Sequence, residues 1–130
     1  MQQTHQPLVL YIEDNDDNRK LIKKLLQASG FAVQTATDGV SGLTFLEHTK
    51  PDLILMDIGM PLLDGYATTE RIRAMPGFTE VPIIAVTAHV LRQDEEKTIS
   101  AGCDGYIQKP IDVDRFPEQV QAFLNDTPDI

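Results

Sequence analysis

Acidic side chains follow two of the apolar segments of this chain. Glu13 and Asp14 come directly after one such segment, and Asp57 comes directly after another. Three carboxylates that gather at one place repel one another, so a nearby cation is needed to make ionisation of all three favourable. Mg²⁺ prefers such oxygen ligands, whereas Zn²⁺ prefers His and Cys side chains, and no cluster of these accompanies the acids. The acidic residues therefore predict a magnesium site.

A threonine and a lysine follow two further apolar segments. Thr87 comes after the segment 81–86, and Lys109 comes after the segment 105–108. The ammonium group of Lys109 can pair with a phosphate oxygen, and the hydroxyl group of Thr87 can donate a hydrogen bond to another. An aspartate carboxylate is an established nucleophile in phosphoryl transfer, and a metal beside it neutralises the incoming group. The combination predicts phosphorylation of Asp57.

Each of these residues alone also has an ordinary structural explanation. An aspartate after a strand is often a helix cap, and a single lysine is usually a solvated charge. Their joint placement at strand ends favours a functional role, because ligand-binding and catalytic sites of parallel α/β sheets lie beyond the carboxyl ends of the strands.

Short apolar segments alternate with amphipathic ones along the whole chain. We expect five strands, over residues 8–12, 31–36, 52–56, 81–86 and 105–108. We expect a helix after each strand: the first capped by Asn15 or Asp16 and ended by Gly30, the second starting at Asp38 or Gly39, and the others over 65–75, over 91–101 and from about Asp112. Five such units in sequence predict a parallel sheet with helices on both faces.

Apolar residues at helical spacing mark the helix faces that should pack on the sheet. They are Leu21, Ile22, Leu25 and Leu26 in the first helix, Val40, Leu43 and Leu46 in the second, and Phe116, Val120, Phe123 and Leu124 in the last. The helix over 91–101 is very polar by comparison, which fits either a solvated face or a partner surface.

The overall composition limits the possible functions. The chain has 130 residues and a net charge of −9, so its surface repels nucleic acids and anionic membranes. Cys103 is the only cysteine and is expected to be a packing residue; the lack of a possible internal disulfide suits the cytoplasm. No apolar run is long enough to span a membrane. We expect one domain over 8–125, with tails over 1–7 and 126–130.

The motifs at these positions resemble the receiver domain of bacterial response regulators. The matching stretches are 12–15, 51–61, 64–65, 82–88 and 102–111, and the resemblance extends over about residues 8–124. It implies a five-stranded parallel sheet in the order 2-1-3-4-5, flanked by five helices. It also implies that Glu13, Asp14 and Asp57 bind Mg²⁺, for which Mn²⁺ can substitute, with the backbone carbonyl of Gly59 as a further ligand.

The resemblance further implies a phosphorylation switch. Asp57 accepts a phosphoryl group from a phosphohistidine of a histidine kinase or phosphotransfer protein, and Thr87 and Lys109 contact that group. Thr87 then moves toward the phosphate, Tyr106 turns inward, and the face of the fourth helix, fifth strand and fifth helix changes for a downstream protein. The kinase-side contact is expected near the first helix and the loop after Lys109, whose bond to Pro110 is expected to be cis.

Three functions compete at this point. The first is a stand-alone phospho-acceptor regulator, which is not an enzyme beyond its own phosphorylation and dephosphorylation. The second is a haloacid-dehalogenase-like phosphohydrolase, although such enzymes commonly carry a second aspartate where this chain has Gly59. The third is a receiver-like interaction module without phosphorylation, which would lack an acid, Thr87 or Lys109. The sequence also leaves open whether the chain is a piece of a hybrid kinase.

Two positions near the expected site have open roles. Gly59 has no side chain that could control how hydrolytic water reaches the phosphorylated aspartate, so the sequence does not decide the phosphate lifetime. His89 either lines the entrance to the site or is a surface histidine without a role.

Overall fold

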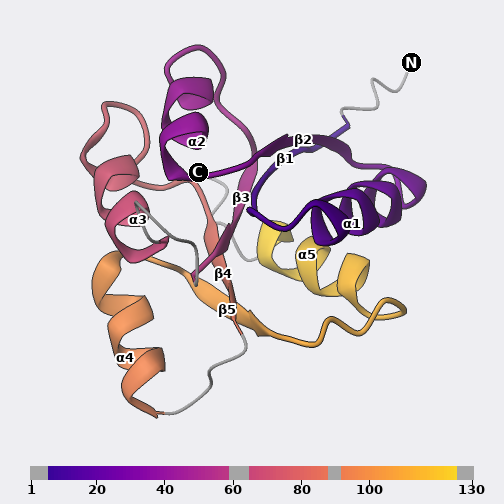
Figure 1. The fold of residues 1–130 in the computed structure, drawn as a ribbon. Coiled ribbons are helices and arrows are strands. Elements are labelled where there is room, and N and C mark those ends of the chain that lie inside the picture. Colours follow the sequence, from indigo (N-terminus) through magenta and orange to yellow (C-terminus); the bar gives the residue numbers. More distant parts are fainter. Residues whose placement is uncertain (1–5, 59–64, 88–91, 126–130) are drawn as a thin grey trace.

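The computed structural model describes residues 6–58, 65–87 and 92–125, and shows one parallel sheet between two layers of helices (Figure 1). The strand order is β2-β1-β3-β4-β5, as predicted. The strands are β1 (Leu8–Ile12), β2 (Ala32–Ala36), β3 (Leu53–Asp57), β4 (Ile83–Thr87) and β5 (Gly105–Gln108). The helices are α1 (Asp16–Ala28), α2 (Gly39–Leu46), α3 (Gly65–Ala74), α4 (Arg92–Ala101) and α5 (Phe116–Asn125). The predicted fold class is confirmed.

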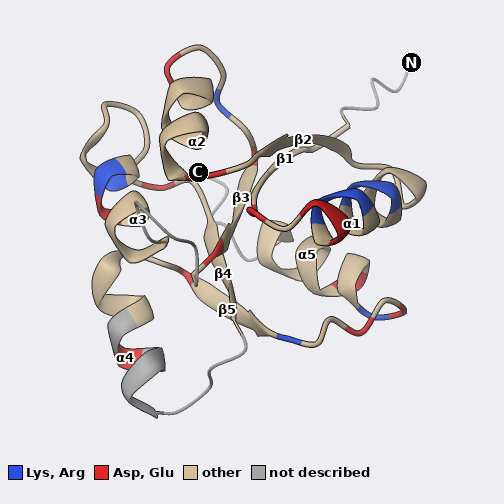
Figure 2. Ribbon diagram, in the orientation of Figure 1, with Lys and Arg blue, Asp and Glu red and all other residues tan. Residues whose placement is uncertain are grey.

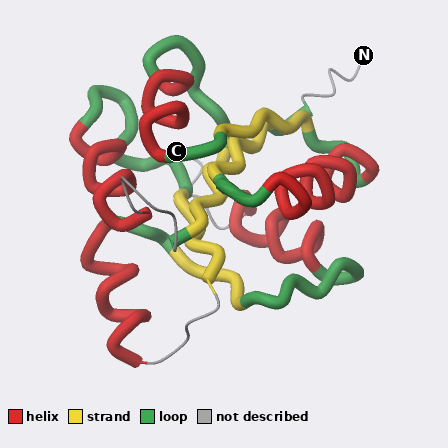
Figure 3. Tube along the Cα trace, in the orientation of Figure 1, coloured by secondary structure: helices red, strands yellow, loops and turns green. Residues whose placement is uncertain are grey.

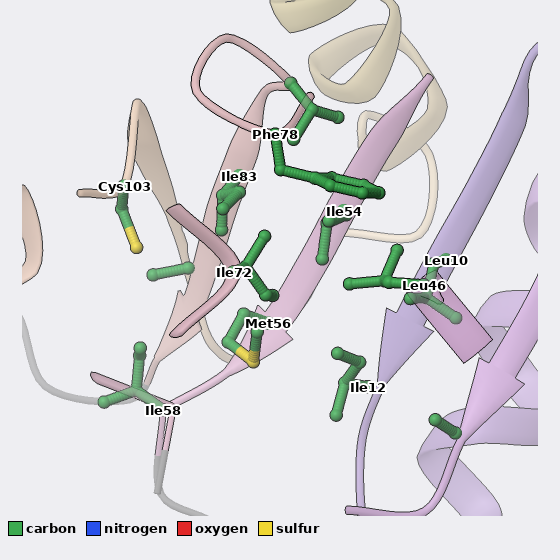
Figure 4. Close-up of a cluster of buried hydrophobic side chains, with 13 residues drawn as sticks. Leu10, Ile12, Leu46, Ile54, Met56, Ile58, Ile72, Phe78, Ile83 and Cys103 are labelled. Carbon is green, nitrogen blue, oxygen red and sulfur yellow. The ribbon is translucent and has the colours of Figure 1, made fainter. Parts of the chain in front are cut away.

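Each face of the sheet carries its own apolar core. Alternate residues of a strand point to opposite faces, so Tyr11 packs toward α1 and α5, whereas Leu10 and Ile12 pack toward α2 and α3. Figure 3 shows α1 and α5 together on one side of the strands and α2, α3 and α4 on the other. Figure 4 shows the second of these cores, where Ile72 of α3 and Leu46 of α2 lie over the central strands.

Side-chain caps fix the first residues of two helices. The side chain of Asn15 accepts a hydrogen bond from the backbone N–H of Asn18 at 2.9 Å, and α1 begins one residue later. The side chain of Asp38 accepts one from the N–H of Ser41 at 2.7 Å at the start of α2. This bond favours the ionised carboxylate and lowers the pKa of Asp38. Asn15 is one of the two caps predicted for α1, and α2 begins at Gly39, one of the two starting residues predicted for it.

The helix faces are narrower than predicted. Leu21 is 49% exposed and Val40 is 59% exposed, although both were expected to pack on the sheet. A helix buries only the stripe that points at its neighbour, and that stripe passes through Ile22 and Leu26 in α1 and through Leu46 in α2. Leu21 and Val40 lie beside the stripe and not within it.

The last helix begins later than predicted. It starts at Phe116 and not near Asp112, because Pro117 has no N–H with which to bond the carbonyl group of Val113. The preceding residues form a turn in which the N–H groups of Arg115 and Phe116 bond the carbonyl oxygen of Asp112 at 3.0 and 2.9 Å. Within the described ranges, no helix is long and apolar enough to cross a membrane.

Candidate metal-binding site

Glu13, Asp14 and Asp57 meet at the carboxyl edge of the sheet. Each offers one carboxylate oxygen, and these three oxygens lie within 4.8 Å of one another. Their proximity follows from the topology, since Glu13 and Asp14 follow β1, Asp57 ends β3, and the two strands pair directly. Glu13 and Asp57 are buried, whereas Asp14 is exposed. The structure thus brings the three acids together, and their role as metal ligands stays a prediction.

Lys109 reaches the acids from the end of β5. Its Nζ lies 3.4 Å from Oε1 of Glu13 and 3.4 Å from Oδ1 of Asp57. Its backbone N–H donates to the carbonyl oxygen of Thr87 at 2.7 Å, which ties the end of β5 to the end of β4. The bond from Lys109 to Pro110 is cis, as expected.

The charges of this group fit a divalent cation. With all groups ionised, three carboxylates and one ammonium group leave two negative charges at a site where Glu13 and Asp57 are buried and Asp14 is exposed. The carboxylates supply only oxygen ligands, and the group contains no histidine or cysteine. These are the ligand properties that Mg²⁺ prefers and that Zn²⁺ does not.

The two predicted switch residues lie on neighbouring strands. Thr87 is the last residue of β4, one position beyond Val86, which pairs with Asp57. Its side chain is buried beside the carboxyl edge. Tyr106 lies on β5 opposite Ala85 and packs, partly buried, against the core beneath α2 and α3. Gly59 and His89 lie outside the described residues.

Glu13 is held by partners that the sequence prediction did not include. The hydroxyl group of Tyr11 donates to Glu13 Oε1 at 2.8 Å, and the N–H of Asn15 donates to Oε2 at 3.3 Å. Burial, with the negative charge of Glu13 beside it, raises the pKa of the Tyr11 hydroxyl far above its ordinary value, so the group stays a donor. Strand alternation, which places residues 11 and 13 on one face, is the sequence signal that could have predicted this contact.

A groove lies beside α1, with Lys109 in its lining. It has a volume of about 240 Å³ and lies between α1 and the segment that follows β5. Its lining residues are Asn18, Leu21, Ile22, Lys109, Pro110 and Ile111. The exposed side chain of Leu21 therefore forms part of a groove wall. Lys109 belongs both to the groove lining and to the acidic site.

Comparison with known proteins identifies the family. Residues 9–121 match the response regulator receiver domain. The polar-differentiation response regulators DivK of Brucella anthropi and Brucella ovis are each 39% identical to this chain over 118 residues, which cover 91% of it and 96% of each of them.

Solved structures agree with this relationship. The receiver domain of sensor histidine kinase PA1611 from Pseudomonas aeruginosa, described with a magnesium ion coordinated in its active site cleft, is 34% identical with a TM-score of 0.85. That alignment covers 94% of this chain and 100% of that one. Chemotaxis protein CheY4 of Vibrio cholerae has a TM-score of 0.88 at 24% identity, over 92% of this chain and 99% of its own, and supports the fold alone. The chain belongs to the response regulator receiver domain family.

Proposed function

We propose that this receiver domain accepts a phosphoryl group on Asp57 in a Mg²⁺-dependent reaction and passes the signal on through a change of its surface. The observation that carries this proposal is the convergence of three carboxylates and the Lys109 ammonium group around Asp57. The 34% identical receiver domain of PA1611, described with a magnesium ion coordinated in its active site cleft, supports the same use of the site here.

The residues of the site have separate roles in this reaction. Glu13, Asp14 and Asp57 hold the metal, with the carbonyl group of Gly59 as a further ligand by resemblance. When bound, Mg²⁺ or Mn²⁺ neutralises charge on the transferred group. A carboxylate oxygen of Asp57 attacks the phosphorus atom of a phosphohistidine, so an O–P bond forms while the N–P bond breaks and the imidazole leaves.

Lys109 and Thr87 act on the transferred group. The ammonium group of Lys109, now between Glu13 and Asp57, pairs with a phosphoryl oxygen. The hydroxyl group of Thr87 donates to a second oxygen. Because the N–H of Lys109 bonds the carbonyl oxygen of Thr87, a shift at either strand end reaches the other. Tyr106 on β5 follows that shift, and the α4-β5-α5 face, where Ile99 is 56% exposed, contacts a downstream protein.

The groove beside α1 is the proposed contact with the phosphohistidine donor, a histidine kinase or phosphotransfer protein. It begins at Lys109, next to the acceptor, and its walls expose Leu21. Lys20, Lys23 and Lys24 lie exposed on the same helix, along which Figure 2 shows a run of blue residues. This face therefore suits a donor whose surface combines an apolar side chain with acidic residues.

The relatives support a regulator and not an enzyme acting on other substrates. The match to the DivK response regulators extends over 96% of their length, which favours a regulatory role for this chain. Catalysis by this chain is limited in the proposal to its own phosphorylation and dephosphorylation.

Labelling with a small phosphodonor tests the proposal. Purified protein is incubated with acetyl phosphate, with Mg²⁺ or with a chelator, and its intact mass is measured. We expect the addition of one phosphoryl group with Mg²⁺ only, and no addition to Asp57→Asn. Equal labelling of wild type and Asp57→Asn would refute the assigned acceptor.

A further inference from the structure

Tyr11 is a buried tyrosine whose one polar atom points at the acidic site. It lies in the middle of β1, its side chain is fully buried between the sheet and the helices α1 and α5, and its hydroxyl group meets Glu13 Oε1 at 2.8 Å. A phenylalanine would fill the same apolar space. The hydroxyl group therefore needs an explanation other than packing.

Glu13 needs hydrogen-bond donors because it is only 1% exposed. A buried carboxylate that loses its donors is costly. Its Oε2 receives the N–H of Asn15 at 3.3 Å, and its Oε1 receives Tyr11 and, at 3.4 Å, the ammonium group of Lys109. Two donors thus share the oxygen Oε1.

Lys109 cannot serve Glu13 throughout the reaction. Its Nζ is shared with Asp57, and in the proposed function it pairs with a phosphoryl oxygen. When it does so, the hydroxyl group of Tyr11 is the donor that remains to Oε1 of Glu13 among the described residues. That group comes from the sheet core, where the backbone of β1 is paired on both sides, so its position is fixed.

We propose that Tyr11 is a positioning residue of the metal site: its hydroxyl group holds the carboxylate of Glu13 in the orientation that Mg²⁺ binding requires. This inference rests on the proposed function and adds a residue to it. Groups that orient a metal ligand typically contribute about 10-fold or more to metal affinity. We therefore expect Tyr11→Phe to raise the dissociation constant for Mg²⁺ by ~10-fold.

If Tyr11 only positions Glu13, its loss should weaken Mg²⁺ binding and leave the maximal rate of phosphorylation unchanged. Once Mg²⁺ is saturating, the same ligands are in place in Tyr11→Phe. The maximal rate of labelling by acetyl phosphate should then equal that of the wild type, whereas the Mg²⁺ concentration for half-maximal rate should rise with the dissociation constant. A general loss of structure would lower the maximal rate as well.

The experiment is a Mg²⁺ titration of the whole chain, followed by amide chemical shifts and by calorimetry. Tyr66→Phe is the matched control, since it removes the same atom from a tyrosine that packs on the other face of the sheet. We expect weaker binding in Tyr11→Phe and wild-type binding in Tyr66→Phe. Equal affinity of Tyr11→Phe and wild type would overturn the inference, as would equal weakening of both variants. If the wild type itself does not bind Mg²⁺, the proposed function fails instead.

A second measurement keeps the inference testable if Tyr11→Phe does not fold. The chain has three tyrosines and no tryptophan. When Tyr66 and Tyr106 are replaced by phenylalanine, the tyrosine absorbance of the protein comes from Tyr11 alone. Mg²⁺ binding at Glu13 should change the absorbance of Tyr11 and saturate with the metal. An unchanged spectrum at saturating Mg²⁺ would overturn the inference.

Discussion

The ammonium nitrogen of Lys109 lies 3.4 Å from Oδ1 of Asp57, although 52 positions separate the two residues in the chain. The strand order produces this contact. Asp57 ends β3, Lys109 follows β5, and β4 lies between them, with Thr87 at its end bonded to the backbone of Lys109. The long lysine side chain spans the width of one strand and places a positive charge where the metal is proposed to bind.

Loss of the positive charge of Lys109 should strengthen Mg²⁺ binding but weaken phosphorylation. In Lys109→Met the side chain keeps its apolar part but no longer neutralises Glu13 and Asp57. We expect Mg²⁺ to bind about fivefold more tightly, which corresponds to ~1 kcal/mol for a partly exposed ion pair. Labelling by acetyl phosphate should nevertheless fall sharply, because no cation meets the phosphoryl oxygen. Weaker Mg²⁺ binding in this variant, measured by calorimetry, would contradict the assigned charge balance.

Neutralising the acceptor should stabilise the fold in the absence of metal. Asp57→Asn removes one of three clustered carboxylates, so we expect the free energy of unfolding in chelator to rise by about 1 kcal/mol. Added Mg²⁺ should stabilise the wild type but hardly affect the variant. Urea unfolding at constant ionic strength measures both effects.

Asp52→Asn is the matched control for that change. Asp52 directly precedes β3, at the amino ends of the strands and away from the acidic site. Its Oδ2 accepts the N–H of Leu8 at 2.7 Å. Loss of this charge-assisted bond should destabilise the chain by about 1 kcal/mol, with no dependence on Mg²⁺. A gain of stability in Asp52→Asn as large as in Asp57→Asn would mean that net charge, and not the cluster, is responsible.

The sequence predicted the fold and the meeting of the acids because strand ends are local features with clear boundaries. Glu13, Asp57 and Lys109 each follow a short apolar run, and a parallel sheet collects such ends at one edge. The exposure of Leu21 and Val40 was predicted wrongly, since helical spacing gives a face but not its width. The contact from Tyr11 to Glu13 depends on side-chain direction and burial, which apolar spacing does not report.

Leu21 should affect transfer from a protein donor and not from a small one. Its exposed side chain lines the groove next to Lys109. An aspartate there places charge against the proposed partner, and we expect Leu21→Asp to slow phosphotransfer from the kinase by about tenfold, or ~1.4 kcal/mol. Labelling by acetyl phosphate should be unchanged, because that donor needs no docking surface.

Val40→Asp provides the comparison, since Val40 is a similarly exposed aliphatic residue on α2, on the other side of the sheet. We expect wild-type rates with both donors. If Leu21→Asp and Val40→Asp slow the protein donor equally, the groove is not the docking site.

Cys103 should make the stability of the fold decrease at alkaline pH. Burial raises the pKa of its thiol from 9.0 to about 11. Between these values the unfolded chain loses the proton while the folded chain retains it, so rising pH favours unfolding. The full stability should be present below about pH 9, and roughly 2 kcal/mol should be lost by pH 11. Cys103→Ala should lack this extra slope, and identical pH profiles of the two proteins would contradict the prediction.

Arg73 should contribute to stability through its geometry as well as its charge. Its guanidinium group donates to the carbonyl oxygens of Gly102 at 2.9 Å and Val81 at 2.7 Å, and to Oδ2 of Asp104 at 2.7 Å. The same Oδ2 of Asp104 accepts the N–H of Ile83 at 2.9 Å. The Arg73 side chain therefore connects α3 to the segment before β4 and to the turn before β5.

A lysine at position 73 keeps the charge but cannot reproduce the planar arrangement of donors. We expect Arg73→Lys to lower the free energy of unfolding by about 2–4 kcal/mol, because partly buried carbonyl groups and Asp104 lose their donors. Arg71→Lys, in the same helix but exposed, should change it by less than about 0.5 kcal/mol. Urea unfolding of the two variants decides the matter: equal effects would show that the positive charge alone, and not the fork of donors, holds these segments together.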